Sequence, residues 1–209
     1  MTNETKKPSR AEVAYHILKD RIMSNQAPSG TLLSEVALTK ELNMSRTPIR
    51  EALKILESED LVEIIDGVGS FVKKITEKDI EDAYAVRQVL EIFAAQTAIT
   101  AFTAEELDSL EERFRLIQKR LQNGEAVSIE EFTNADWALH DQLLQKSGNR
   151  YAQAMIDNLS VVMRRYQALS VRLLCNTEKS LEEHLGIIEC IRRRDLDNLT
   201  ALLKNHIKY

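Results

Sequence analysis

Four side chains in the second half of the chain are of the types that bind transition-metal ions. Asp136 precedes His140 by four residues, so the two side chains lie on one face of a helix. A carboxylate and an imidazole at this spacing can share one divalent ion, and His184 and His206 could complete the site. Scattered Asp and His residues are more often ordinary surface or core residues, so the spacing alone leaves both interpretations open.

The elements that must bring these residues together follow residue 75, where every signal is helical. Capping residues and stop signals predict helices over about residues 76–102, 103–124, 128–148, 149–174, 177–194 and 196–208. The three histidines fall on three different helices of this set. Residues 76–209 are therefore predicted to form an antiparallel six-helix bundle, large enough to bury a core and a cavity.

Arginines inside this bundle are candidates for binding an anion. Arg87 lies on the apolar stripe of the first bundle helix, where a buried cation needs a negatively charged partner. Glu91, four residues later, is one such partner and the carboxylate of a bound ligand is another, and both can hold together. Arg164 and Arg165 lie on the fourth bundle helix, and we expect one of them, taken as Arg164, to reach the same pocket.

Residues 11–75 combine short helices with a hairpin. Apolar faces and caps predict helices over residues 11–23, 35–42 and 45–58, with Ser45 as the cap of the third and Asn43 in the tight turn before it. Two short strands, 61–65 and 69–73, flank a turn at residues 66–68. This layout is a winged helix-turn-helix, so the predicted fold class is mainly α, with that domain at 11–75 and the helical bundle at 76–209.

The third helix of this domain carries residues suited to reading DNA. Arg46 and Arg50 project from one face, and each can donate two hydrogen bonds to guanine, with about 1–3 kcal/mol of discrimination. Ser45 and Thr47 can bond phosphates or bases at the helix N-terminus, and Gly67 lets the hairpin tip approach DNA closely. A small helical domain with a solvated charged face has the same composition, so residue types alone do not decide.

Charge and composition narrow the class of protein. The net charge is −5, and all the excess acid lies in residues 76–209, because residues 1–75 are neutral overall. This charge argues against a protein that coats DNA without sequence specificity, whereas a site-specific DNA-binding protein needs only a local basic stripe. No apolar run approaches the roughly 20 residues that span a bilayer, and residues 1–10 carry no secretory signal. With two cysteines and no CxxC pair, we expect a cytoplasmic protein with reduced thiols and no membrane partner.

One run of residues closely resembles a known family. The run Ser45-Arg46-Thr47-Pro48-Ile49-Arg50-Glu51-Ala52-Leu53, with Gly67-Val68-Gly69 after it, is similar to the GntR family of bacterial transcription regulators. The resemblance implies that Arg46, Thr47 and Arg50 contact a palindromic operator bound by a homodimer. Val36 and Asp66 stand where relatives place residues that suit DNA contact. Base reading is thus expected from Arg46 and Arg50, and wing contact only from the backbone of Gly67.

The second part resembles the FCD effector domain of one branch of that family. The similarity is carried by Asp136-Trp137-Ala138-Leu139-His140, Glu183-His184 and His206, and with the first part it covers about residues 11–208. It implies a metal site made by Asp136, His140, His184 and His206, with water or a small organic acid at the remaining positions. It also implies Arg87 near the effector. The donor set suits Zn²⁺, Ni²⁺ or Mn²⁺, and six bundle helices indicate the VanR-like subgroup.

The function that this combination predicts is a regulator, usually a repressor, whose operator binding responds to a small carboxylate effector at the metal site. An alternative is a metal-responsive regulator in which the ion itself is the signal. An enzyme is a different class, because an Asp/His₃ site could activate water. No separate general base is apparent, however, and a fused DNA reader has no role in that scheme, so we expect no catalysis.

Overall fold

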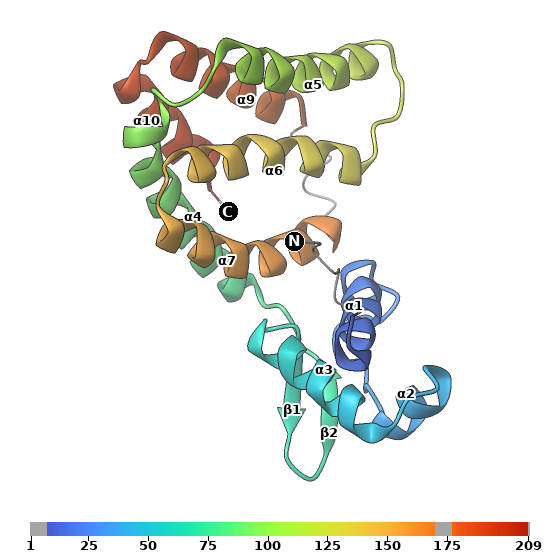
Figure 1. The fold of residues 1–209 in the computed structure, drawn as a ribbon. Helices are drawn as coiled ribbons and strands as arrows, with labels where there is room; N and C mark the ends of the chain where they lie inside the picture. The colour runs from blue at the N-terminus through green and yellow to red at the C-terminus, as the bar shows by residue number, and fades with distance from the viewer. Residues whose placement is uncertain (1–7, 170–176, 209) are drawn as a thin grey trace, which may run out of the picture. The chain divides into compact units, whose positions relative to one another are not determined.

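The computed structural model describes residues 8–169 and 177–208, and the chain divides into two compact units between Thr76 and Glu77 (Figure 1). We describe each unit by itself. Within the described ranges no helix is long and apolar enough to cross a membrane. Cys190 is a partly buried free thiol, and Cys175 lies outside the described residues.

The N-terminal unit has the predicted winged helix-turn-helix order. Its helices are α1 (Arg10–Met23), α2 (Glu35–Glu41) and α3 (Arg46–Ser58). An antiparallel hairpin follows, made by β1 (Val62–Ile65) and β2 (Gly69–Val72). Val62 pairs with Val72 and Ile65 pairs with Gly69, so residues 66–68 form the tip (Figure 1).

Helix α3 is placed by its apolar row. Ile49, Leu53 and Leu56 are at most 1% exposed, and α3 packs mainly against α1. Asn43 adopts a φ of +50°, which confirms its predicted role in the turn between α2 and α3. The opposite side of α3 is left exposed, and this is the side that carries the arginines.

One local prediction for α3 is wrong. Ser45 is the N-cap residue, as expected, but its side chain makes no capping hydrogen bond. The cap side chain normally accepts from the backbone N–H of the second or third helical residue. Pro48 occupies the third position and has no N–H, so one of the two usual donors is missing.

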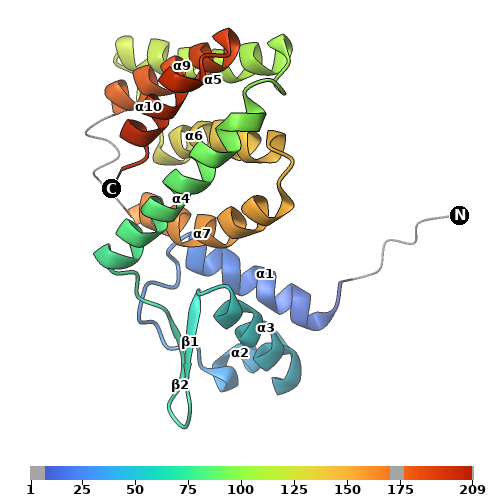
Figure 2. The same ribbon diagram turned by 90° about the vertical axis from the view of Figure 1, so that its left-hand side faces the viewer.

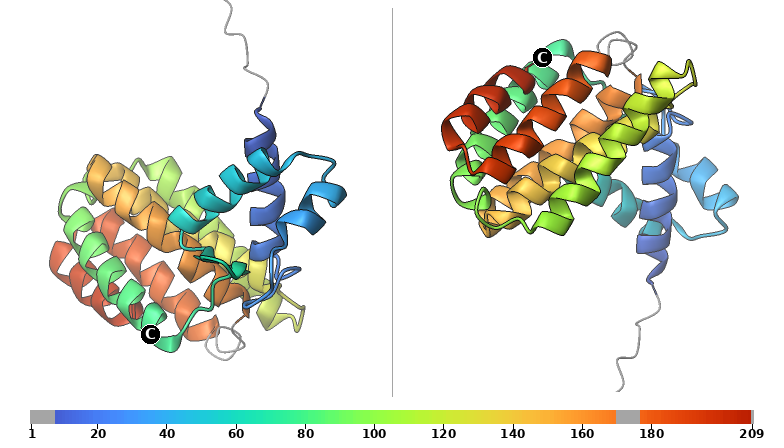
Figure 3. Two further views of the ribbon diagram at one scale, coloured as in Figure 1. Left: turned by 90° about the horizontal axis from the view of Figure 1, so that it is seen from below. Right: turned by 90° about the horizontal axis from the view of Figure 1, so that it is seen from above.

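The described residues of the C-terminal unit form helices joined by short connections, with no strand among them, as predicted. Its helices are α4 (Glu77–Ala98), α5 (Ala104–Gln122), α6 (Ile129–Lys146), α7 (Arg150–Leu169), α9 (Thr177–Arg193) and α10 (Leu196–His206). The predicted extension of the fourth bundle helix to residue 174 lies outside the described residues. Figures 2 and 3 show these helices side by side, with α6 among α4, α5 and α7.

Local capping explains why several of these helices begin where they do. Thr103 and Glu106 form a reciprocal capping box at α5, and Ser128 accepts from the third backbone N–H of α6. The side-chain oxygen of Asn149 accepts from two backbone N–H groups at the start of α7. These caps account for the predicted helix starts near residues 103, 128 and 149. The apolar face of α6 places Leu139 and Leu143 in the main core of the unit.

Candidate metal centre and nucleic-acid interface

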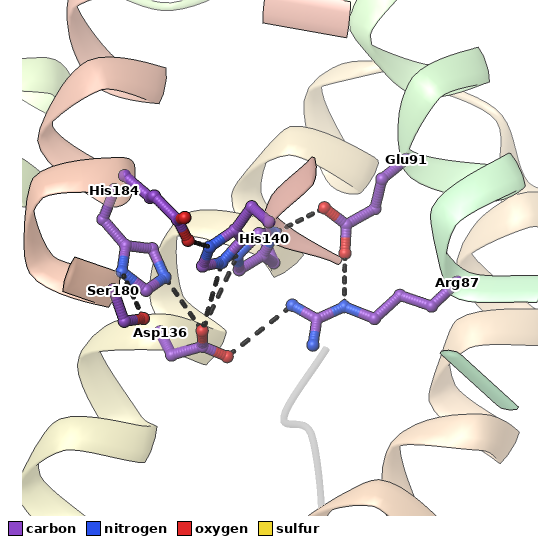
Figure 4. Close-up of polar contacts among 8 residues, drawn as sticks. Arg87, Glu91, Asp136, His140, Ser180 and His184 are labelled. Carbon is purple, nitrogen blue, oxygen red and sulfur yellow. Dashed lines mark hydrogen bonds and ion pairs between the residues drawn. The ribbon is translucent and has the colours of Figure 1, made fainter. Parts of the chain in front are cut away.

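Three helices of the C-terminal unit bring four potential ligands together in its interior (Figure 4). α6 contributes Asp136 and His140 one turn apart, α9 contributes His184, and α10 contributes His206. One ligand atom from each lies within 4.8 Å of every other, and all four side chains are at most 10% exposed. The i, i+4 spacing on α6 thus produces the shared face that the sequence predicts.

The Nε2 atoms of the three histidines face one oxygen of Asp136. Oδ1 of Asp136 is 2.8 Å from Nε2 of His184, 3.7 Å from that of His140 and 3.8 Å from that of His206. The Nε2 atoms of His140 and His206 are 3.2 Å apart. Ligand atoms about 2.0–2.1 Å from one tetrahedral ion lie about 3.3 Å from one another. The four side chains therefore have a spacing that a single small ion can bridge.

Two of the histidines are held from outside by carboxylates. Nδ1 of His140 hydrogen-bonds a carboxylate oxygen of Glu91 on α4, and Nδ1 of His206 lies 2.8 Å from a carboxylate oxygen of Glu183 on α9. An ionised carboxylate can only accept a hydrogen bond. Each Nδ1 therefore carries the proton, and each Nε2 directs its lone pair toward Asp136.

His184 is held differently. Its Nδ1 is 3.5 Å from the hydroxyl oxygen of Ser180 on the same helix (Figure 4). The ring of Phe114, from α5, stacks on the imidazole with centroids 4.5 Å apart and an interplanar angle of 12°. This ring contact limits rotation of His184, because Phe114 is fully buried in the core.

Burial sets the protonation state of the histidines. It lowers the pKa of His184 to about 4 and also lowers the pKa of His140, so both imidazoles are neutral at pH 7. Burial acts in the same direction on His206, but contacts with Asp136 outweigh it and raise the pKa of this residue. Burial opposes ionisation of Asp136, yet its interactions with His140 and with the guanidinium of Arg87 hold its pKa well below the usual value.

Arg87 forms the buried ion pair that the sequence suggests. Its Nε is 2.6 Å from Oε1 of Glu91, and the two side chains are 3% and 0% exposed. Burial raises the pKa of Glu91, but His140 and Arg87 outweigh this and bring it to about 2. Nη2 of Arg87 is 3.6 Å from Oδ2 of Asp136, and both atoms are buried without a hydrogen-bond partner. Arg87 therefore has spare hydrogen-bonding capacity beside the histidines.

A cavity of about 120 Å³ adjoins this group. Its lining includes Tyr84, Arg87, Phe132, Asp136, Ser180 and His206. Arg164 is not part of this lining, although its guanidinium lies 4.7 Å from the centroid of the Trp137 ring. The guanidinium of Arg87 lies 4.9 Å from the same centroid, so Trp137 packs beside the centre.

The N-terminal unit presents a basic row on α3. Arg46, Arg50 and Lys54 are exposed and recur every four residues, opposite the buried apolar row. Ser45 and Thr47 are also exposed at the start of this helix. At the hairpin tip Gly67 has a φ of +74°, and a Cβ added there would meet no atom within 4 Å. The predicted DNA-contacting residues therefore lie on accessible surface of this unit.

Arg50 has a partner that the sequence did not reveal. Its Nε lies 2.8 and 2.9 Å from the two carboxylate oxygens of Glu35 on α2. The ion pair leaves 58% of the Arg50 side chain exposed. An open groove of about 460 Å³ continues from this pair, past Lys54, to the hairpin tip.

Sequence reasoning missed Glu35, Glu183 and Ser180 as partners of functional side chains. Ser180 precedes His184 by four residues, so their shared helix face was a usable signal. Glu183 and Glu35 gave no such signal, because each meets its partner on a different helix.

Comparison with known proteins supports the family resemblance of both parts of the chain. Residues 10–72 match the bacterial regulatory proteins of the gntR family, and residues 82–209 match the FCD domain. The gluconate operon transcriptional repressor of Bacillus licheniformis is 32% identical over 90% of this chain and 79% of its own. This chain belongs to the GntR family. The transcriptional repressor RspR of Escherichia coli K12 is a further GntR relative, 29% identical over 93% of this chain and 84% of its own.

Solved structures agree on the fold of this GntR-family chain. A putative GntR regulator from Rhodococcus sp. RHA1 has a TM-score of 0.74 at 23% identity and covers 96% of this chain and 94% of its own. McbR/YncC of E. coli has a TM-score of 0.72 at 20% identity, with the same coverage. The chain is thus a DNA-binding transcription regulator of the FCD branch and not an enzyme.

Proposed function

We propose that this GntR-family regulator binds a palindromic operator as a homodimer and acts as a repressor controlled by a small organic acid beside a metal ion. The single observation that carries effector control is the buried Asp/His₃ cluster next to a cavity lined by Arg87, whose Nη2 has no hydrogen-bond partner. The Bacillus gluconate operon repressor, at 32% identity, supports the choice of repressor.

Asp136, His140, His184 and His206 would hold the ion. The Nε2 atoms of the three histidines converge on one oxygen of Asp136, and a divalent cation bound among them would accept a lone pair from each once the His184 proton lies on Nδ1. Imidazole and carboxylate ligands suit Zn²⁺, Ni²⁺ or Mn²⁺. When bound, the ion supplies a positive charge and open coordination positions for a carboxylate.

Arg87 is the second anchor that we propose for the effector. Its Nε is taken by Glu91, but its buried Nη2 has no hydrogen-bond partner and the residue lines the cavity. A carboxylate that enters the cavity could accept from Nη2, and a charge-assisted bond of this kind is stronger than a neutral one. Arg164 does not line this cavity, so its proposed contribution to effector binding is limited to its contact with the ring of Trp137.

For operator binding, we propose that Arg46 and Arg50 hydrogen-bond base edges in the major groove. Ser45 and Thr47 would contact phosphates. The backbone of Gly67, at the tip of the hairpin that forms the wing, would also contact the DNA. The support is the exposed row on α3, in a unit that matches the family's DNA-binding domain. Because Ser45 makes no capping hydrogen bond, its hydroxyl is available to a phosphate.

Thermal unfolding of the full chain tests the effector site. The protein is first stripped with a chelator, then loaded with Zn²⁺, Ni²⁺ or Mn²⁺, and finally screened with gluconate, other sugar acids and hydroxy acids. A ligand at 100 times its Kd adds about 2.7 kcal/mol, which corresponds to a rise of roughly 5–10 °C in Tm for a chain of this size. Ligand shifts that occur equally in wild type and in His184→Ala would contradict the proposed site.

Operator control is tested separately. A binding sequence selected from random DNA is labelled, and its affinity is measured by fluorescence anisotropy with and without metal and acid. We expect an acid that stabilises the protein to change operator affinity by roughly 5–150-fold. If the metal alone produces the whole change, the ion itself is the signal.

A further inference from the structure

Helix α2 carries an exposed valine in its first turn. Val36 is the second residue of α2 and is 49% exposed. A single exposed apolar residue is ordinary by itself. The position of Val36 is what distinguishes it, because the residue before it, Glu35, binds Nε of Arg50 on α3 at 2.8 and 2.9 Å. An apolar side chain therefore lies next to the ion pair of a proposed base-contacting arginine.

Helix geometry shows which side of α2 carries Val36. Successive residues of an α-helix are about 100° apart around its axis. Leu38 is buried in the unit, Glu41 on one flank of it pairs with α1, and Glu35 on the other flank pairs with α3. Val36 lies about 100° from Glu35 and about 140° from Glu41. It is thus closer to the flank that meets α3, and it points away from the buried side.

The exposed basic row of α3 lies along that same flank. In a helix-turn-helix the second helix occupies the major groove, and the first helix crosses the DNA backbone beside it. Helices α2 and α3 are neighbours in this unit (Figure 1). Lys40, one turn after Val36, is also exposed and can contact a phosphate. If Arg50 contacts a base edge, Val36 enters the same groove beside it.

The chemistry of the major groove restricts what a valine can contact there. Each base pair presents hydrogen-bond donors and acceptors, and the one apolar group on offer is the C5 methyl group of thymine. Valine has no polar atom, so against a donor or acceptor it would displace water without replacing the hydrogen bond. Contact with a thymine methyl group carries no such cost and removes apolar surface from water.

We propose that Val36 is a specificity-determining residue that contacts the methyl group of a thymine close to the base pair of Arg50, an inference that rests on the proposed operator binding. Each half-site of the operator then has one thymine recognised by its methyl group. Burying a group of this size changes an affinity by about fourfold, and two half-sites together change it by about 15-fold.

Replacement of thymine by deoxyuridine tests this proposal, because it removes the methyl group and keeps the base pairing. An operator is selected from random DNA with the wild-type full chain, and Arg50→Ala identifies the base pair that Arg50 contacts. Each thymine is then replaced in both half-sites, and the affinity is measured by fluorescence anisotropy. We expect one position, within two base pairs of that of Arg50, at which the wild type loses affinity by about 15-fold.

Val36→Ala should remove this sensitivity. The variant lacks the two methyl groups of valine, so it should bind the thymine and deoxyuridine operators with equal affinity. Ile55→Ala is the matched control, because it truncates a branched apolar side chain that is 38% exposed, on α3 but about 140° around the helix from Arg50. It should keep the 15-fold ratio. Circular dichroism confirms that each variant is folded.

Two results would overturn the proposal while leaving operator binding intact. One is a selected operator without thymine within two base pairs of the Arg50 position. The other is a deoxyuridine effect of the same size in Val36→Ala and in wild type, since the methyl group would then act through another residue. A wild type that selects no sequence would instead contradict the proposed operator function, and this inference with it.

Discussion

Glu91 is the residue at which the fold and the candidate metal centre depend most directly on each other. It is fully buried, its Oε1 accepts from Nε of Arg87 at 2.6 Å, and its other oxygen binds Nδ1 of His140. Glu91→Gln keeps the volume of the side chain but removes its charge. The substitution therefore weakens a buried ion pair and the outer support of a proposed ligand at the same time.

The expected loss of stability arises because the buried charge of Arg87 loses its partner. Removing one partner of a buried pair costs about 3–5 kcal/mol, because the other charge is left without compensation. Asp136 lies 3.6 Å from Nη2 of Arg87 and offsets part of this cost, so we expect a value near the lower limit, about 3 kcal/mol. For a chain of this size that corresponds to a fall in Tm of roughly 6–12 °C.

The expected loss of metal affinity comes from His140. The charge of Glu91 makes the imidazole a better ligand and fixes its proton on Nδ1. Removing such an outer partner typically weakens metal binding by about 10–100-fold. Competition with a chromophoric chelator measures the affinity for Zn²⁺. Calorimetry of the metal-free protein measures the loss of unfolding free energy separately.

Glu183→Gln is the matched control. Glu183 supports His206 through a 2.8 Å contact, but its side chain is 23% exposed and Arg87 is not its partner. We expect a smaller loss of metal affinity and a change in stability below about 1 kcal/mol. If Glu91→Gln bound Zn²⁺ with wild-type affinity, or if Glu183→Gln were the more damaging variant, our account of the centre would be refuted.

Three further predictions concern the DNA surface and the ion. Arg50→Ala should weaken operator binding by about 1–3 kcal/mol and relax selectivity at one base pair per half-site, measured by anisotropy on substituted operators. Glu35→Gln removes the acid that holds Nε of Arg50 and should lower the ratio of specific to nonspecific affinity. Glu41→Gln on the same helix should leave that ratio unchanged, and an equal effect of the two would argue against a positioning role. Stripping the metal should lower Tm reversibly, and His184→Ala should abolish the response to added Zn²⁺; an unchanged Tm on chelation would contradict a structural ion.

Several features of this protein were determined by sequence, because they depend on neighbours along the chain. Thr103 and Glu106 form a capping box within one helical turn, and Asn43 adopts the left-handed conformation in its own turn. Asp136 and His140 share a helix face for the same reason. The missing capping bond at Ser45 also has a local contribution, because Pro48 stands three residues later and lacks one of the two usual donors.

Other features were decided only when distant helices packed. Sequence spacing could not reveal that Glu183 on α9 reaches His206 on α10, or that Glu35 of α2 holds Arg50 of α3. The spacing of apolar residues along α4 is compatible with one apolar side or with two. Only the helices packed against α4 decide which side is buried. Because α6, α7 and α10 cover three sides of α4, Arg87 is enclosed while Val89 is left in solvent. A local pattern sets which residues share a face, but the packing of other helices decides what that face meets.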